Sequence, residues 1–300
     1  MPCPGPAPPS PSERNAVPAT RPAEFAVERE GCRLAGEAVG EGTPILLLHG
    51  VTATRRYVVH GSMALARAGF HQLSYDARGH GQSDPAPEDG GYTYAELVAD
   101  LDAVVAAEIG ERPFALAGHS MGAHTAVAYA LERAERLAGL IVIGPVYTGF
   151  IDEEVIAGWD RLAEGLDRGG VEGFLQAFDR CLDPRWRATV LRFTRQRMLE
   201  HRHPSAVARA LREVPRSAPF EAMAELEFVD LPALVVASHD VADPGHPYAV
   251  AAAYAARLPE ARLVSEEEGA SPLAWQGGRL AREIANFCAT PAVAKRLSRS

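Results

Sequence analysis

A five-residue segment, Gly118 to Gly122 (GHSMG), limits the folds open to this chain more than any other part of its sequence. It follows an apolar run at 114–117, typical of a strand buried on both faces, and precedes a helical pattern at 121–131. Because glycine lets backbone segments approach closely, the two glycines permit a strained turn between strand and helix. Such a turn lifts the hydroxyl of Ser120 above the sheet, beside a helix N-terminus. The segment therefore predicts an α/β sheet and a candidate nucleophile.

Strand and helix patterns alternate on both sides of this segment. Continuous apolar runs predict further buried strands at 44–48, 70–75, 140–143, 232–237 and 261–265. Helical spacing of apolar residues predicts helices at 62–68, 95–109, 248–257 and 278–287. Residues 24–39 are typical of a hairpin that turns at Glu30 and Gly31. We therefore expect an α/β fold with a doubly wound, mostly parallel sheet and right-handed crossovers.

The alternation stops in the middle of the chain. Residues 147–226 carry helical patterns without a convincing strand, which predicts a helical insert within one sheet domain. The sheet domain is expected to comprise residues 23–146 and 227–291. The first 22 residues are rich in proline, and we interpret them as a disordered arm rather than a signal peptide, because they lack an apolar segment. Residues 292–300 are expected to form a short, frayed tail.

Charge and hydropathy exclude two classes of partner. The chain carries a net charge of −9, which argues against nucleic-acid binding, since that requires a basic face. No apolar run approaches the roughly 20 residues that a membrane-spanning helix needs. Ten arginines against three acidic residues lie between Arg180 and Arg216. They could steer an anionic substrate, but we favour a solvated helix face.

The cysteines are scattered rather than clustered. Their positions lack metal-binding spacing and suit reduced thiols, which indicates a cytoplasmic protein: Cys3, Cys32, Cys181 and Cys288. We expect neither a metal nor an organic cofactor. The sequence does not indicate the oligomeric state.

Three segments together resemble the α/β-hydrolase superfamily, in its serine-hydrolase branch of esterases, lipases and C–C hydrolases. They are the GHSMG turn, Leu48 to Val51 (LHGV), and Asp76 to Asp84 (DARGHGQSD). The resemblance covers about residues 24–290 and implies that the helical insert is a cap over the active site. It implies a hydrolase of a small ester, thioester or similar substrate. Branches with a nucleophilic aspartate are disfavoured, because position 120 is serine.

The resemblance also implies roles for individual residues. Ser120 would be the nucleophile, and the backbone N–H groups of Val51 and Met121 would form the oxyanion hole. The family pattern G-x-x-D-x-x-x-P lies over residues 237–244 and places the catalytic acid at Asp240. Asp243 is the second choice for the acid, with helix capping as its structural alternative.

The catalytic histidine is where this sequence departs from the family. Ala270 occupies the expected position after the last strand, and no histidine follows His246. His246 is the best candidate for a substitute base, ahead of His124 and His239. Without a base, the Ser120 hydroxyl stays a weak nucleophile. The alternative hypothesis is therefore a pseudoenzyme or small-molecule-binding protein on the same fold.

Overall fold

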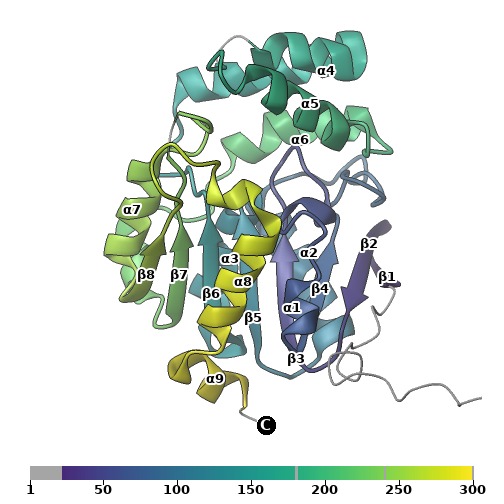
Figure 1. The fold of residues 1–300 in the computed structure, drawn as a ribbon. Helices are drawn as coiled ribbons and strands as arrows, with labels where there is room; N and C mark the ends of the chain where they lie inside the picture. Colours follow the sequence, from purple (N-terminus) through teal and green to yellow (C-terminus); the bar gives the residue numbers. More distant parts are fainter. Residues whose placement is uncertain (1–21, 180–181, 240, 299–300) are drawn as a thin grey trace, which may run out of the picture.

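The computed structural model describes residues 22–179, 182–239 and 241–298. These form an eight-stranded sheet in the order β1-β2-β4-β3-β5-β6-β7-β8, with helices on both faces (Figure 1). β1 and β2 run antiparallel to their neighbours, and the other strands pair in parallel. The predicted doubly wound, mostly parallel sheet is confirmed. All but the last residue of the predicted arm at 1–22 lies outside the described residues.

The strands fall close to their predicted positions. In chain order they are β1 (Ala23–Arg29), β2 (Cys32–Val39), β3 (Thr43–Leu48), β4 (Phe70–Tyr75), β5 (Phe114–His119), β6 (Leu137–Ile143), β7 (Pro232–Val236) and β8 (Glu260–Val264). β3, β5, β6 and β7 are almost entirely buried, as expected for parallel strands covered on both faces. Glu30 and Gly31 both have positive φ (50° and 77°), which is the two-residue turn that matches the twist of a hairpin.

Each face of the sheet packs against its own group of helices. One group comprises α2 (Tyr94–Val104), α3 (Met121–Arg133) and α7 (Tyr248–Arg257), and the other comprises α1 (Ala64–Arg67), α8 (Gly277–Cys288) and α9 (Pro291–Leu297). The existence of α9 corrects the prediction of a frayed tail over most of its length. Val293 is fully buried there, and Leu297 packs against the same cluster, so the segment has its own apolar anchor.

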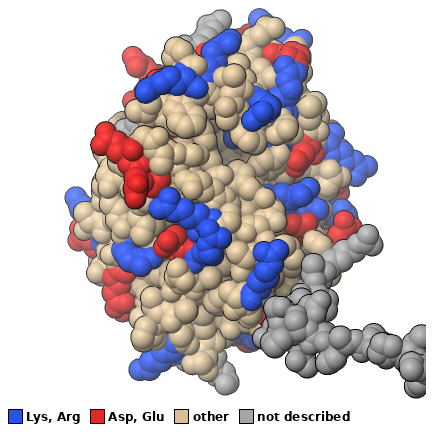
Figure 2. Space-filling view, viewed as in Figure 1, with Lys and Arg blue, Asp and Glu red and all other residues tan. Residues whose placement is uncertain are grey.

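Segment 147–226 forms the helices α4 (Glu153–Phe178), α5 (Arg187–Met198) and α6 (Pro204–Glu213). They lie together at one end of the sheet (Figure 1). Many arginines of segment 147–226 form surface ion pairs, among them Arg212–Asp167 and Arg216–Asp160, so basic and acidic side chains are interspersed there (Figure 2). This pairing agrees with a solvated helix face rather than a cationic lid.

The described cysteines are unpaired, and the described helices are short or polar compared with a membrane span. Cys32 and Cys288 are free, buried thiols, and Cys3 and Cys181 lie outside the described residues. Among the described helices, none is both long and apolar enough to cross a bilayer.

Candidate active site

Ser120 lies in the turn between β5 and α3, in a backbone conformation that residues other than glycine rarely adopt. Its φ is 54° and its ψ is −116°. Both flanking glycines are required sterically: a Cβ on Gly118 would overlap the carbonyl of Gly122, and one on Gly122 would overlap the carbonyl of Leu48. Strain of this kind persists only where the surrounding structure enforces it, and it concentrates at functional sites.

Two backbone N–H groups beside Ser120 are available to a ligand. Met121 is the first residue of α3, so its N–H has no acceptor within the helix. No described residue accepts a hydrogen bond from the N–H of Val51, which follows β3 by three positions. The carbonyl of Val51 is 2.8 Å from His80 Nε2, which fixes the orientation of that loop. The site therefore has two donors at one helix N-terminus and one adjacent loop.

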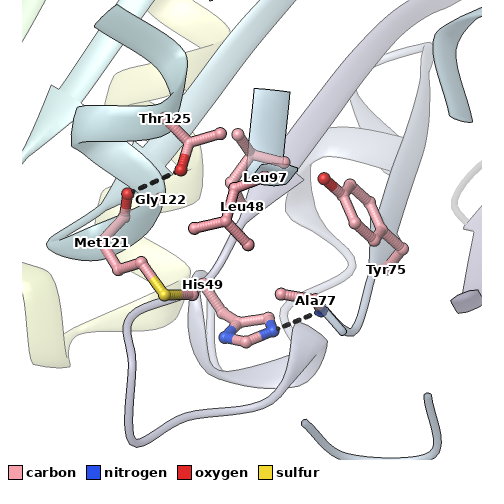
Figure 3. Close-up of a pocket in the computed structure, with 8 residues that line it drawn as sticks. All are labelled: Leu48, His49, Tyr75, Ala77, Leu97, Met121, Gly122 and Thr125. Atoms are coloured by element: carbon pink, nitrogen blue, oxygen red, sulfur yellow. Dashed lines mark hydrogen bonds between the residues drawn. The ribbon is translucent and has the colours of Figure 1, made fainter. Parts of the chain in front are cut away.

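Two buried side chains, His49 and Thr125, hydrogen-bond the backbone near these donors (Figure 3). His49 Nε2 accepts from the Ala77 N–H at 2.9 Å, so the ring proton is on Nδ1, which donates to the Gly50 carbonyl at 2.8 Å. Thr125 Oγ1 donates to the Met121 carbonyl at 2.9 Å. The space between these groups is about 10 Å³, which holds no more than one water. The donor loop and the start of α3 are therefore rigidly mounted.

His246 and Asp243 form a hydrogen-bonded pair in the loop before α7. His246 Nδ1 lies 2.9 Å and 3.0 Å from the two carboxylate oxygens of Asp243. Burial alone would raise the pKa of Asp243, but the His246 ring, with His119 and Arg197 nearby, holds it below its ordinary value. An ionised carboxylate accepts the Nδ1 proton, so Nε2 of neutral His246 carries a free lone pair.

This pair lies close to the Ser120 turn. The rings of His246 and His119, the residue before Ser120, have centroids 4.8 Å apart. A Cβ on Gly144 would touch the His246 ring at 3.3 Å. The Ser120 N–H donates to the carbonyl of Ile143, the residue before Gly144, at 3.0 Å. His246 therefore borders His119 and Gly144, at the ends of the neighbouring strands β5 and β6, although no described side chain hydrogen-bonds Ser120 Oγ.

The remaining predicted site residues are Asp240, Ala270 and His124. Asp240 lies outside the described residues. Ala270 lies in an exposed turn after β8, and its N–H donates to the Glu267 carbonyl at 3.0 Å. His124 cannot serve as the base, because its Nε2 already accepts from the N–H groups of Val146 and Tyr147 at 3.0 Å and 3.2 Å.

Ser120 opens on a cavity of about 190 Å³ between the sheet domain and the helical insert. The serine turn, the start of α3 and the loop after β3 form one side of its lining, with Met121, His124 and Val51. Apolar residues of the insert, such as Ile156 and Trp159, also line it. Tyr94 and Ser217 also line it, and neither was a candidate from the sequence. Nothing in their local sequence distinguishes them, since only the fold brings them to this cavity.

Comparison with known proteins identifies the family to which this fold belongs. A profile described as alpha/beta hydrolase fold matches residues 43–266, well over half of the chain. The chain belongs to the alpha/beta hydrolase fold family. The match includes β3, the serine turn and the Asp243–His246 loop.

Curated relatives in the alpha/beta hydrolase fold family match the chain over short stretches. The AB hydrolase superfamily protein YisY of Bacillus subtilis is 33% identical over 116 residues, which is 37% of this chain and 42% of YisY. Epoxide hydrolase B of Mycobacterium tuberculosis is 32% identical over 109 residues, covering 36% of this chain and 30% of its own. The chain thus spans less than half the length of each of these relatives.

Solved structures match over almost the whole fold. A thermophilic esterase from Thermogutta terrifontis has a TM-score of 0.74 at 23% identity, covering 93% of this chain and 100% of its own. An enol-lactonase from Burkholderia xenovorans has a TM-score of 0.71 at 24% identity, covering 89% of this chain and 100% of its own. At these identities the likeness concerns the alpha/beta hydrolase fold alone.

Proposed function

We propose that this chain is a serine hydrolase that cleaves small ester or thioester substrates through Ser120. The observation that carries the proposal is the strained turn that places Ser120 on the wall of a cavity, with the Asp243–His246 pair near that turn. A serine hydroxyl becomes an effective nucleophile when a positioned base removes its proton as it attacks. We assign this role to His246 Nε2.

In the first step, Ser120 Oγ attacks the substrate carbonyl carbon while His246 Nε2 takes the hydroxyl proton. Asp243 holds the Nδ1 proton and stabilises the imidazolium that forms. The oxyanion accepts hydrogen bonds from the N–H groups of Val51 and Met121, and each such donor is typically worth about 3 kcal/mol. Imidazolium then gives its proton to the leaving alcohol or thiol, which leaves an acyl group on Ser120. Water, deprotonated by His246, attacks the acyl group and regenerates the serine.

Asp243 replaces Asp240 as our proposed acid, because Asp243 bonds His246 directly. The two residues are separated by only two others, so a single loop would supply both acid and base. Each step uses groups of the protein itself. Ser120 argues against the aspartate-nucleophile chemistry of some family branches, even though epoxide hydrolases are among the relatives.

The cavity supports a small, largely apolar substrate arm. A volume of about 190 Å³ lies below the range of drug-sized ligand pockets, which begins at about 300 Å³. The segment 147–226 would act as a cap, since its residues supply much of the wall. The free thiols of Cys32 and Cys288 support a cytoplasmic location.

A second candidate is a binding protein without turnover. The observation that favours it is that no described side chain hydrogen-bonds Ser120 Oγ. Catalytic hydrogen bonds are often long in ligand-free enzymes and tighten when substrate binds. Turnover therefore decides between the two candidates.

We expect hydrolysis of p-nitrophenyl acetate by the full chain, followed as nitrophenolate release. Ser120→Ala should reduce the rate by at least 10³-fold, because the acyl intermediate cannot form. Alanine suffers the same backbone strain as serine, so the variant should keep its melting temperature. An equal rate in both proteins, or no rate in either, would leave the binding protein as the better assignment.

A further inference from the structure

The protonation of His124 can be deduced from its partners. Its Nε2 accepts from two backbone N–H groups, those of Val146 and Tyr147. An N–H at Nε2 would therefore point at two other donors. A neutral imidazole has one N–H, which must then be on Nδ1. Burial lowers the pKa of His124 to about 3, so the ring is neutral at physiological pH.

The proton on His124 Nδ1 determines how the Tyr94 hydroxyl forms hydrogen bonds. His124 Nδ1 lies 2.8 Å from the Tyr94 hydroxyl oxygen. Since Nδ1 carries the proton, the hydroxyl oxygen is the acceptor, and the phenolic hydrogen is directed elsewhere. No described residue accepts that hydrogen, although Tyr94 is 5% exposed and lines the cavity at Ser120.

The hydroxyl of Ser217 is likewise an acceptor whose own hydrogen has no described partner. Its Oγ accepts from the Tyr94 N–H at 2.9 Å, and no described residue accepts its hydroxyl hydrogen. Ser217 also lines the cavity. The remaining wall is mostly apolar, including Val146, Val214 and Trp159. The largely apolar cavity thus contains the hydroxyls of Tyr94 and Ser217, neither with a described acceptor, alongside those of Ser120, Tyr147 and Thr148.

A hydroxyl without a hydrogen-bond partner in such a cavity favours binding of a ligand that carries a hydrogen-bond acceptor. A polar group that loses water without gaining a partner costs free energy, so an apolar ligand would be disfavoured there. A carbonyl oxygen offers two lone pairs and no hydrogen, so it can accept from one or two such hydroxyls. The carboxylate of Asp152, also on the cavity wall, disfavours an anionic ligand in this cavity.

We propose that the hydroxyls of Tyr94 and Ser217 bind a second carbonyl oxygen of the substrate, so that the chain prefers neutral oxo esters to simple alkyl esters. This inference rests on the proposed function for the reacting ester group. It assigns Tyr94 and Ser217 as specificity-determining residues, separate from the oxyanion donors.

The test is a binding comparison in the Ser120→Ala background, where turnover does not interfere. The probes are ethyl pentanoate and its 3-oxo and 4-oxo derivatives, measured by ligand-observed NMR titration. We expect at least one oxo ester to bind about tenfold more tightly than ethyl pentanoate, as one or two neutral hydrogen bonds allow. Adding Tyr94→Phe should reduce this ratio to less than threefold, and Ser217→Ala should also reduce it.

The matched control is Tyr92→Phe. The Tyr92 hydroxyl is buried and accepts from the Ala86 N–H, but it does not line the cavity, so the ratio should be unchanged. A merely structural effect of Tyr94→Phe would weaken both kinds of ester equally. Equal binding of oxo and simple esters, or a ratio that survives Tyr94→Phe, would overturn the inference. Failure of the proposed function is distinguishable, because it would abolish turnover by the unmodified chain and leave the binding ratio intact.

Discussion

Replacing His246 with alanine is expected to lower kcat for p-nitrophenyl acetate by about 10⁴-fold, which is the upper end for loss of a general base. The reason is that His246 Nε2 is the one free imidazole lone pair that the described structure places beside the Ser120 turn with a carboxylate behind it. The melting temperature should change little, since His246 lies in a loop and is partly exposed.

His239→Ala is the matched control for this loss. His239 precedes the same loop and stacks on the ring of Tyr248 with centroids 5.2 Å apart, away from the Asp243 pair. Its removal should leave kcat within twofold. If both variants lose activity equally, the loop rather than the His246 base would be responsible.

The same assay separates the two candidate acids. Asp243→Asn should reduce kcat by about 10²-fold or more, because the amide can hold the wrong tautomer of His246. Asp240→Asn should retain most of the activity. The reverse order of effects would restore Asp240 as the catalytic acid and reduce Asp243 to a helix-capping role.

The second large effect concerns stability in acid. Burial lowers the pKa of His49 to about 4 and that of His124 to about 3. In the unfolded chain both rings would titrate near 6.5, so below that pH the unfolded state binds more protons than the folded state. Their contribution to stability is therefore complete above about pH 7 and is lost as the pH falls toward 4. Near pH 5 these two rings together should lower the free energy of unfolding by about 3 kcal/mol for each unit by which the pH falls.

Urea unfolding at pH 7, 6 and 5 measures this slope. Because domains are typically stable by about 5–15 kcal/mol, the loss should shift the urea midpoint strongly. His124→Gln should lower stability at pH 7 but reduce the slope by about 1.4 kcal/mol per pH unit, since it removes one of several rings whose pKa is lowered by burial, His119 among them. A stability that is constant from pH 7 to pH 5 would show that these rings are not buried as neutral groups.

Local patterns made most of the sheet predictable. The GHSMG segment required a strand, a strained turn and a helix, and the strain is present as a φ of 54° at Ser120. Gly31 marked the hairpin turn because glycine readily accepts the positive φ that it has there. Helix α9 was missed because its apolar anchor, Val293, becomes meaningful only when β6 lies beneath it.

The pairing of Asp243 with His246 and the cavity donors depend on contacts that no local pattern encodes. The spacing of a family motif favoured Asp240, whereas the direction of a loop brings Asp243 to His246. His124 was a plausible substitute base in the sequence because it lies four residues after Ser120. Two backbone N–H groups from a different segment use its lone pair, and this tertiary contact also frees the proton of Tyr94.

Intact-mass analysis after incubation with a fluorophosphonate, with peptide mapping of the adduct, tests whether His246 and Asp243 activate Ser120. We predict one adduct per chain, on Ser120, with labelling at least 10²-fold slower in His246→Ala and none in Ser120→Ala. Folded protein that remains unlabelled after long incubation, or that labels equally fast without His246, would contradict the account.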